Sequence, residues 1–516
     1  MKFKLPLLVL SFAVLPVLFV AVSSHAAPGA ASANTGTLFR EGGAQLPAYP
    51  VVVRDELPPA RDARMKWFRD AHFGIFIHWG VYSVPAYAPV YSKTEMKYAE
   101  WYWHSLNNGP ESSTRKFHER VYGPNFSYFD FAPMFKAELY DPDQWADVIK
   151  RSGAKYVALT SKHHEGFTLW KNAEANRAWG RPWNAVDIGP KRDVALELME
   201  AGRRKGLRMG IYYSLYEWYN PLWLADKPRY VAAHMFPQFR DAVNHLKPSI
   251  IFSDGEWELP SADWRSAELL AWLFNESPVA GEVVINDRWG KDTRHRHGGY
   301  YTTEYTSGMQ ASAHPWEESR GMAFSYGYNR TEGAEDYRTD RELLMMLIDI
   351  VSRGGNLLLD IGPRADGRIP PIMEERLLQL GEWLRVNGEA IYGTRARNVT
   401  RQWSEGTVPV LEEKEYMSEY PITALVDTPP TGSARVEAFF TLGNGAVYAI
   451  LPRRPISEVL LRGIDAGAGV HVTLLDGGQP LESRMENGNL RVSIPTALSA
   501  SLAARQAYVL KLAGAK

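Results

Sequence analysis

Short apolar runs alternate with amphipathic segments between residues 56 and 400, and this alternation constrains the fold more than any other feature of the sequence. Helical spacing of apolar residues separates several of the runs, as over Asp143–Ser152 and Val194–Lys205. The pattern predicts an α/β fold with a parallel sheet, in the form of a (β/α)₈-like (TIM-type) barrel with insertions over residues 56–400. A doubly wound open sheet is the alternative, although no Gly-x-Gly-x-x-Gly fingerprint follows a first strand. The expected strands are Phe73–Ile77, Tyr156–Leu159, Met209–Tyr213, Ile250–Phe252, Val283–Ile285 and Leu357–Ile361.

The pattern changes after residue 400 to short alternating strands separated by turns. Gly477-Gly478 and Asn487-Gly488-Asn489 are typical of tight hairpin connections. Residues 401–516 are therefore predicted to form a separate C-terminal all-β sandwich domain.

Residues 1–26 have the pattern of a secretory signal peptide. A basic start at Met1–Lys4 precedes an apolar run from Leu5 to Val22, and small residues surround an expected cleavage point near Ala26. The pattern predicts an exported protein, periplasmic or secreted, without a membrane segment after cleavage. A retained membrane anchor is the alternative, because about 18 apolar residues can just span a bilayer. Residues 27–55, rich in Ala, Gly and Ser, are expected to form a flexible lead-in.

Charge and residue usage restrict the class of partner. The 58 Lys and Arg residues balance 59 Asp and Glu residues, so no overall field attracts nucleic acid or an anionic membrane. Aromatic residues make up 12% of the chain and include 17 Trp, which suits either flat sugar-binding faces or a Trp-rich core. The chain has no cysteine, so disulfides and lipid-modified cysteines are excluded. The sequence leaves the oligomeric state open, a homo-oligomer included.

Polar and aromatic side chains follow the expected barrel strands, where such a barrel places its chemistry. They include His78, the pair His163 and His164, Asp254 with Gly255, and Arg288. This mixture of hydrogen-bond donors and aromatic walls is typical of a small-ligand pocket. A zinc site is the competing interpretation of the three histidines, but adjacent strand residues face opposite sides and no ligand spacing supports it. We expect no metal and no cofactor.

Glycoside cleavage requires two carboxyl groups, and the sequence offers candidates for both. Asp254 ends the apolar strand Ile250–Phe252 with a glycine behind it, which suits a nucleophile, although a helix N-cap is the structural alternative. Glu304 lies among tyrosines that could hold a general acid in a partly desolvated site. Glu317 is its rival. Glu256, Glu258 and Glu100 are the remaining candidates.

Several longer segments, in order through residues 60–395, resemble glycoside hydrolase family 29, the α-L-fucosidases. The matching segments are Phe73–Gly80, Glu100–Tyr102, Lys162–Phe167, Asp187–Asp193, Ser253–Trp257, Asn286–Gly290, Trp316-Glu317 and Ser325–Asn329. The resemblance implies a barrel followed by a β-sandwich and retaining hydrolysis of terminal α-L-fucose on oligosaccharides or glycoconjugates. The implied partner is a fucosylated glycan.

The resemblance also implies roles for individual residues. Asp254 would be the nucleophile that forms a covalent fucosyl-enzyme, with Arg288 beside it. The acid/base would be Glu304, as in some bacterial members, or Glu317, as in others. Phe252 stands where many members have a tryptophan. The substrate-binding residues expected around the pocket are His78, Glu100, Trp101, His163, His164, Tyr213, Phe252, Arg288 and Trp316.

Two further hypotheses remain at this point. A catalytically idle, lectin-like fucose-binding protein would keep the pocket without the chemistry. A hydrolase of the same mechanism could act instead on a related sugar such as galactose. Fucose carries a methyl group at C5, so an apolar patch near Phe76 or Phe252 would favour fucose.

Overall fold

The computed structural model describes residues 58–310, 312–418 and 420–515. The predicted signal peptide and the expected lead-in lie outside these residues. Within the described residues, no helix combines the length and the apolar character needed to cross a bilayer.

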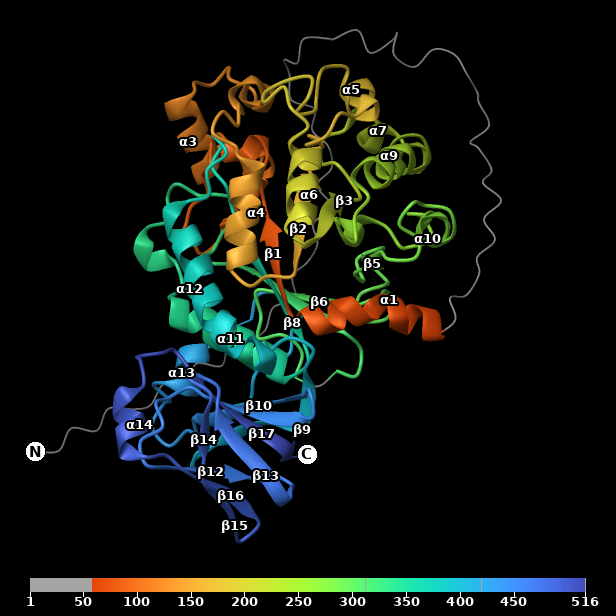
Figure 1. Cartoon of the computed structure of the whole chain (residues 1–516). Helices are drawn as coiled ribbons and strands as arrows, with labels where there is room; N and C mark the ends of the chain where they lie inside the picture. Colours follow the sequence, from red (N-terminus) through yellow and green to blue (C-terminus); the bar gives the residue numbers. More distant parts are fainter. Residues whose placement is uncertain (1–57, 311, 419, 516) are drawn as a thin grey trace, which may run out of the picture. The chain divides into compact units, whose positions relative to one another are not determined.

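The larger part of the described chain is an eight-stranded parallel sheet that curls into a (β/α)₈-like barrel, as predicted (Figure 1). The strand order is β5-β4-β3-β2-β1-β8-β7-β6. The amides of Gly299 and Tyr300 both donate to the Ile285 carbonyl, which brings the two edge strands together. The strands are β1 Phe73–Ile77, β2 Tyr156–Lys162, β3 Arg208–Ser214, β4 Ile250–Asp254, β5 Val284–Ile285, β6 Tyr301–Glu304, β7 Trp316–Gly321 and β8 Asn356–Ile361.

Helices cover the outside of the sheet (Figure 1), and several of them begin with a capping side chain. Helix α4 begins at Pro142 after Asp141, whose carboxylate accepts from the amides of Asp143 and Gln144 at 3.0 and 3.1 Å. The predicted helices near residues 143–152 and 194–205 are confirmed as α4 and α6. The helices of this part are α1 Pro58–Ala71, α2 Tyr102–Leu106, α3 Ser113–Val121, α4 Pro142–Arg151, α5 Ala173–Trp179, α6 Val194–Arg204, α7 Pro221–Ala225, α8 Lys227–Tyr230, α9 Phe236–Leu246, α10 Ser266–Asn275, α11 Asp340–Ser352 and α12 Pro371–Asn387.

The barrel interior is filled rather than open. Met65 and Phe68 of α1 pack with residues from the starts of several strands, among them Tyr156 and Ile250. Helix α1 therefore closes the end of the barrel where the strands begin, and the opposite end, where the strands finish, is left for a pocket.

The C-terminal part is all-β, as predicted, with two antiparallel sheets around a separate apolar core. Its six-stranded sheet has the order β14-β13-β17-β11-β10-β9, and its three-stranded sheet the order β12-β16-β15. The bounds are β9 Arg395–Trp403, β10 Val436–Gly443, β11 Ala446–Leu451, β12 Glu458–Arg462, β13 Ala466–Leu474, β14 Gln479–Leu481, β15 Ser483–Glu486, β16 Asn489–Ser493 and β17 Tyr508–Ala515, with short helices α13 Ile422–Val426 and α14 Thr496–Ser501.

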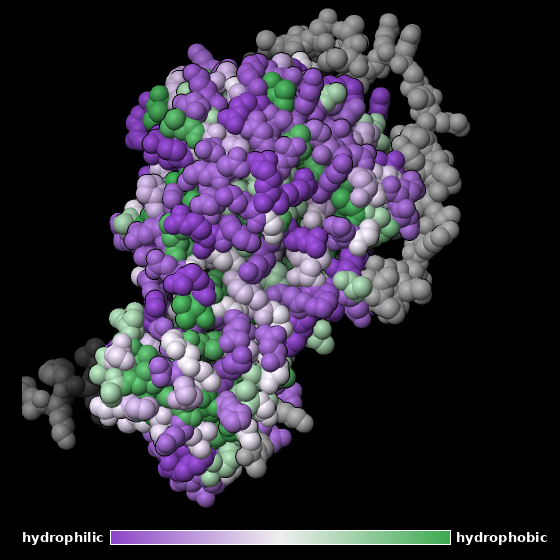
Figure 2. All heavy atoms as spheres, in the orientation of Figure 1, coloured by the Kyte–Doolittle hydropathy of each residue, from purple (hydrophilic) through white to green (hydrophobic). Residues whose placement is uncertain are grey.

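The domain boundary expected between residues 400 and 401 falls within strand β9, which pairs with β10 of the C-terminal sheet. The exact position of the boundary stays a prediction. Buried Asp349 of α11 accepts hydrogen bonds from Arg401 of β9 at 2.5 and 2.8 Å and from the Tyr420 hydroxyl at 2.6 Å. These contacts bind strand β9, the first strand of the C-terminal part, to helix α11 of the barrel. On the face drawn in Figure 2, hydrophilic residues predominate over the barrel helices, and hydrophobic residues are scattered among them.

Candidate active site

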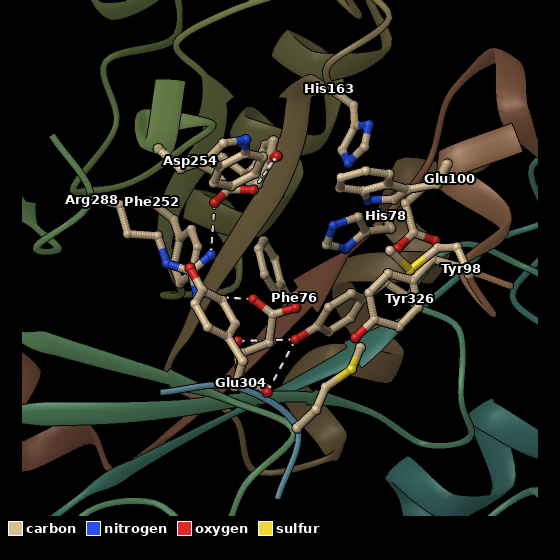
Figure 3. Close-up of a pocket in the computed structure, with 17 residues that line it drawn as sticks. Phe76, His78, Tyr98, Glu100, His163, Phe252, Asp254, Arg288, Glu304 and Tyr326 are labelled. Atoms are coloured by element: carbon tan, nitrogen blue, oxygen red, sulfur yellow. Dashed lines mark hydrogen bonds and ion pairs between the residues drawn. The ribbon is translucent and has the colours of Figure 1, made fainter. Parts of the chain in front are cut away.

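A cavity of about 350 Å³ lies at the end of the barrel where the strands finish (Figure 3). Asp254 and Glu304 are the last residues of β4 and β6, and His78 directly follows β1. The volume is at the lower end of the range of about 300–1000 Å³ that is usual for small ligands. The lining residues are Phe76, His78, Met96, Tyr98, Glu100, Trp101, His163, Tyr212, Phe252, Asp254, Trp257, Arg288, Glu304, Ser319, Tyr326, Tyr416 and Met417.

Asp254 is held by two donors at the end of its strand. One carboxylate oxygen accepts from Arg288 Nη1 at 2.7 Å, and the other accepts from the Tyr212 hydroxyl at 2.8 Å. Burial alone would raise the pKa of Asp254, but the Arg288 charge and both hydrogen bonds outweigh it and lower this pKa below its ordinary value. The carboxyl group is thus kept ionised in a buried position, as a nucleophile requires.

The glycine after Asp254 is required by the backbone and by the packing around it. Gly255 has φ +74°, and a Cβ there would lie 2.5 Å from the ring of Tyr216. A residue with a side chain would have to move that ring. The Asp-Gly pair therefore ends β4 with the carboxylate turned to the cavity. Asp254 does not cap an α-helix, because the element that follows is the three-residue turn Glu256–Glu258, which begins after Gly255.

A single guanidinium joins two of the carboxyl groups that line the cavity, those of Asp254 and Glu304. Besides its bond to Asp254, Arg288 donates from Nη2 to Glu304 at 3.0 Å and from Nε to the Thr302 hydroxyl at 3.1 Å. Figure 3 shows Arg288 between Asp254 and Glu304, with a dashed line to each. Only 2% of Arg288 is exposed, so the interaction is little screened by water.

The backbone of Glu304 is held by a segment from beyond residue 400. Its amide donates to the Glu415 carbonyl at 3.0 Å, and its carbonyl accepts from the Met417 amide at 2.9 Å. The same segment turns the side chains of Tyr416 and Met417 into the cavity wall. Tyr416 lies over the guanidinium of Arg294 at 4.2 Å.

The opposite wall carries buried histidines and a carboxyl group. His78 bonds through Nδ1 to Asp360 at 2.7 Å. Burial lowers the pKa of His78 and raises the pKa of Asp360. Glu100 accepts from the Gly327 amide at 2.8 Å, and burial raises its pKa to about 7. His163 lines the cavity beside them.

His164 is in contact with the nucleophile candidate from behind the cavity surface. It is fully buried, bonds through Nδ1 to the Ser214 hydroxyl at 2.6 Å and approaches Asp254 to 3.5 Å through Nε2. Burial, with the neighbouring His163, lowers the pKa of His164 well below its ordinary value. His164 is therefore a neutral neighbour of Asp254.

Two of the residues expected to bind the substrate, Tyr213 and Trp316, lie outside the cavity lining. Tyr213 points out of the barrel, where its hydroxyl donates to Gln238 at 2.8 Å, and its neighbour Tyr212 takes the place in the cavity because strand residues alternate between faces. Trp316 is buried at the start of β7 with Arg353 over its ring at 5.3 Å, far from the strand ends.

Glu317 is also outside the cavity. Its carboxylate accepts from Tyr156 at the start of β2, and β7 aligns it with Asn356 at the start of β8. Burial raises the pKa of Glu317 to about 8. The other carboxyl candidates have separate partners, since Glu256 contacts Arg294 at 2.9 Å and Glu258 contacts Lys227 at 3.3 Å.

Several lining residues were not predicted from the sequence. Tyr212 lies in an expected strand, and Trp257 and Tyr326 lie within the matching segments, so their positions in the chain were found but the direction of their side chains was not. Nothing local pointed to Met96, Tyr98, Ser319, Tyr416 and Met417. Among the described residues, no cluster of three or more His, Asp or Glu side chains has the arrangement of a metal site.

The chain is similar to known α-L-fucosidases over most of its length. A model of the family described as "Alpha-L-fucosidase" matches residues 57–389. The tissue α-L-fucosidase of Homo sapiens is 39% identical over 470 residues, which cover 89% of this chain and 91% of the human protein. The α-L-fucosidase of Dictyostelium discoideum is 44% identical over 349 residues, which cover 65% of this chain and 73% of that protein.

A solved structure agrees with these relatives. The Thermotoga maritima α-fucosidase in complex with fucose has a TM-score of 0.69 and 33% sequence identity to this chain, with 87% of this chain and 96% of the other covered. The similarity extends through both the barrel and the β-sandwich. The chain belongs to the α-L-fucosidase family of glycoside hydrolases.

Proposed function

We propose that this protein is an exported, retaining exo-glycosidase that removes terminal α-L-fucose from oligosaccharides or glycoconjugates. The observation that carries the proposal is the guanidinium of Arg288, which contacts Asp254 at 2.7 Å and Glu304 at 3.0 Å within one cavity. Retaining glycosidases place one carboxylate as the nucleophile and a second carboxyl group as the acid/base on the scissile bond.

In the first step, an Asp254 oxygen attacks the anomeric carbon while Glu304 donates its proton to the leaving oxygen. The bond between the sugar and the aglycone breaks, and a β-linked fucosyl ester on Asp254 forms. In the second step, Glu304 takes a proton from water, the water oxygen attacks the same carbon, and the ester bond to Asp254 breaks. The sugar leaves as α-L-fucose.

The acid/base role is assigned to Glu304 rather than to Glu317. Glu304 lines the same cavity as Asp254, whereas Glu317 contacts Tyr156 at the closed end of the barrel. A general acid must come within hydrogen-bond reach of the leaving oxygen, and only a carboxyl group on the cavity wall can do so.

An apolar patch in the cavity supports fucose as the sugar. The rings of Phe76 and Phe252 both line it, with their centroids 4.9 Å apart. The C5 methyl of fucose would be buried against them, whereas the hydroxymethyl group of L-galactose would place a hydroxyl there. Leaving that hydroxyl without a partner costs about 1–3 kcal/mol, which is roughly 5- to 150-fold in kcat/KM. On the opposite wall, His78, Glu100 and His163 offer polar partners for ring hydroxyls.

The experiment is hydrolysis of an aryl α-L-fucoside and the matching aryl α-L-galactoside by purified protein, with the product anomer followed by NMR. The expected results are α-L-fucose as the first-formed product and a clear preference for the fucoside. Asp254→Ala should abolish turnover with the circular dichroism spectrum unchanged. First release of the β-anomer would contradict retention. Tight fucose binding without any turnover would favour the lectin-like alternative.

Export rests on residues 1–26, which lie outside the described part of the chain. The N-terminal sequence of protein recovered from the periplasm or medium tests it, with cleavage near Ala26 expected. Recovery of the chain only from the cytosol with Met1 or Lys2 at its start would contradict export.

A further inference from the structure

A second and larger cavity adjoins the fucose pocket. It has a volume of about 1060 Å³, against about 350 Å³ for the pocket itself. The two cavities have three lining residues in common, Met96, Tyr98 and Met417, which we call the threshold. A molecule that fills the pocket can therefore extend across the threshold.

The threshold lies on the side of the pocket occupied by Glu304. Met417 is bonded through its amide to the Glu304 carbonyl at 2.9 Å. Figure 3 shows Tyr98 and Tyr326 across the pocket from Asp254. A leaving group departs beside the acid and away from the nucleophile, so its path leads over the threshold into the second cavity.

Tyr98, one of the threshold residues, has a buried hydroxyl without a hydrogen-bond partner among the described residues. Its side chain is 6% exposed. A buried hydroxyl without a partner is costly unless a ligand supplies one. A sugar hydroxyl that enters over the threshold would satisfy it.

The lining of the second cavity has the chemistry of a neutral saccharide site. Four basic residues, Lys93, Lys97, Arg320 and Arg338, are balanced by four acidic residues, Glu95, Glu335, Asp336 and Glu342. The ring of Phe324 is 38% exposed with the Lys97 ammonium 4.5 Å from its centre, which leaves an aromatic surface at the wall. Aromatic faces and polar groups without net charge suit sugar rings rather than an acidic glycan.

We propose that the second cavity binds the leaving-group part of the substrate, and that this part is a neutral oligosaccharide of more than one sugar. The inference rests on the proposed fucosidase function. Phe324 would then stack against a sugar ring, and Tyr98 would donate a hydrogen bond to the sugar that follows fucose. Both residues act on specificity and leave the reacting atoms to Asp254 and Glu304.

The test compares kcat/KM for an aryl α-L-fucoside with kcat/KM for a neutral fucosylated tetrasaccharide in wild type and Phe324→Ala. We expect Phe324→Ala to lose about tenfold on the tetrasaccharide, since an aromatic contact contributes roughly 1–1.5 kcal/mol, and to change less than twofold on the aryl fucoside. The matched control is Ile456→Ala, an exposed apolar residue outside both cavities, which should change neither rate.

Tyr98→Phe provides a second variant that keeps the ring and removes only the hydroxyl. It should also lower the tetrasaccharide rate more than the aryl rate. Equal rate ratios in wild type and both variants would overturn the inference while aryl fucoside hydrolysis, and with it the proposed function, stands. Absence of aryl fucoside hydrolysis in wild type would instead overturn the proposed function. A wild-type preference for a sialylated over the neutral tetrasaccharide would contradict the neutral character of the site.

Discussion

Removal of the Tyr212 hydroxyl should move the acid limb of the pH profile of kcat/KM to higher pH. Tyr212 is buried and donates to Asp254 at 2.8 Å, and this bond is made to the ionised carboxylate. A hydrogen bond to a charged group contributes about 1.5–3 kcal/mol, and about 1.4 kcal/mol corresponds to one pKa unit. Tyr212→Phe should therefore raise the pKa of Asp254, because the carboxylate loses this stabilisation of about 1.5–3 kcal/mol.

The sign follows from the balance at this carboxyl group. Burial favours the protonated form, while Arg288 and the Tyr212 hydroxyl favour the ionised form and together lower the pKa. Without the hydroxyl, one of the interactions that favour the ionised form is lost and the effect of burial on the pKa is offset less. Asp254 therefore stays protonated to higher pH. A protonated carboxyl group cannot attack, so activity should be lost earlier as the pH falls.

The assay is the pH dependence of kcat/KM on an aryl α-L-fucoside, which reports ionisations of the free enzyme. Tyr213→Phe is the matched control, because Tyr213 is the next residue of β3 and its hydroxyl bonds to Gln238 outside the pocket. The control should keep the wild-type acid limb. An unchanged limb in Tyr212→Phe, or an equal shift in Tyr213→Phe, would refute the reasoning.

Two further substitutions separate the roles of the other carboxyl groups. Glu304→Ala should lose about 10²–10⁴-fold on fucosides with poor leaving groups and far less on activated aryl fucosides, because acid help matters when the leaving oxygen is basic; equal losses on both would remove the acid role from Glu304. Glu317→Gln should keep near-wild-type activity. The variant should also lack a pH dependence of stability that wild type has. In the unfolded chain Glu317 ionises above its ordinary pKa of 4.5, whereas in the folded chain it keeps its proton up to about pH 8. The free energy of unfolding of wild type should therefore fall as the pH rises between these two values, by at most about 1.4 kcal/mol per pH unit. Denaturant unfolding at several pH values measures this, and parallel curves for the two proteins would contradict the raised pKa.

The barrel could be predicted because its strands are apolar runs that end in polar residues. Asp254, Arg288 and His78 were found in this way, since the ends of parallel strands meet at one edge. Strands β6 and β7 were missed because they carry polar residues that are buried in the folded protein, such as Glu317 and Glu318 on β7. An apolar-run criterion cannot detect such strands.

The choice between Tyr212 and Tyr213 could not be made from sequence for a related reason. Residues 209–214 of β3 are buried on both faces, so no alternation of polar and apolar residues marks the inward side. Tyr416 and Met417 were beyond prediction, because more than one hundred residues separate them from Glu304 and only the folded chain brings them together.

The central claim is that Asp254 forms a covalent bond to fucose during turnover. The most direct measurement is incubation with 2-deoxy-2-fluoro-α-L-fucosyl fluoride, followed by proteolysis and mass spectrometry of the labelled peptide. The fluorine at C2 slows release of the ester and lets it accumulate, because it destabilises the oxocarbenium-like transition state. The account predicts one label per chain, on Asp254, and none in Asp254→Ala. A label on another residue, or continued turnover of the natural substrate by Asp254→Ala, would contradict it.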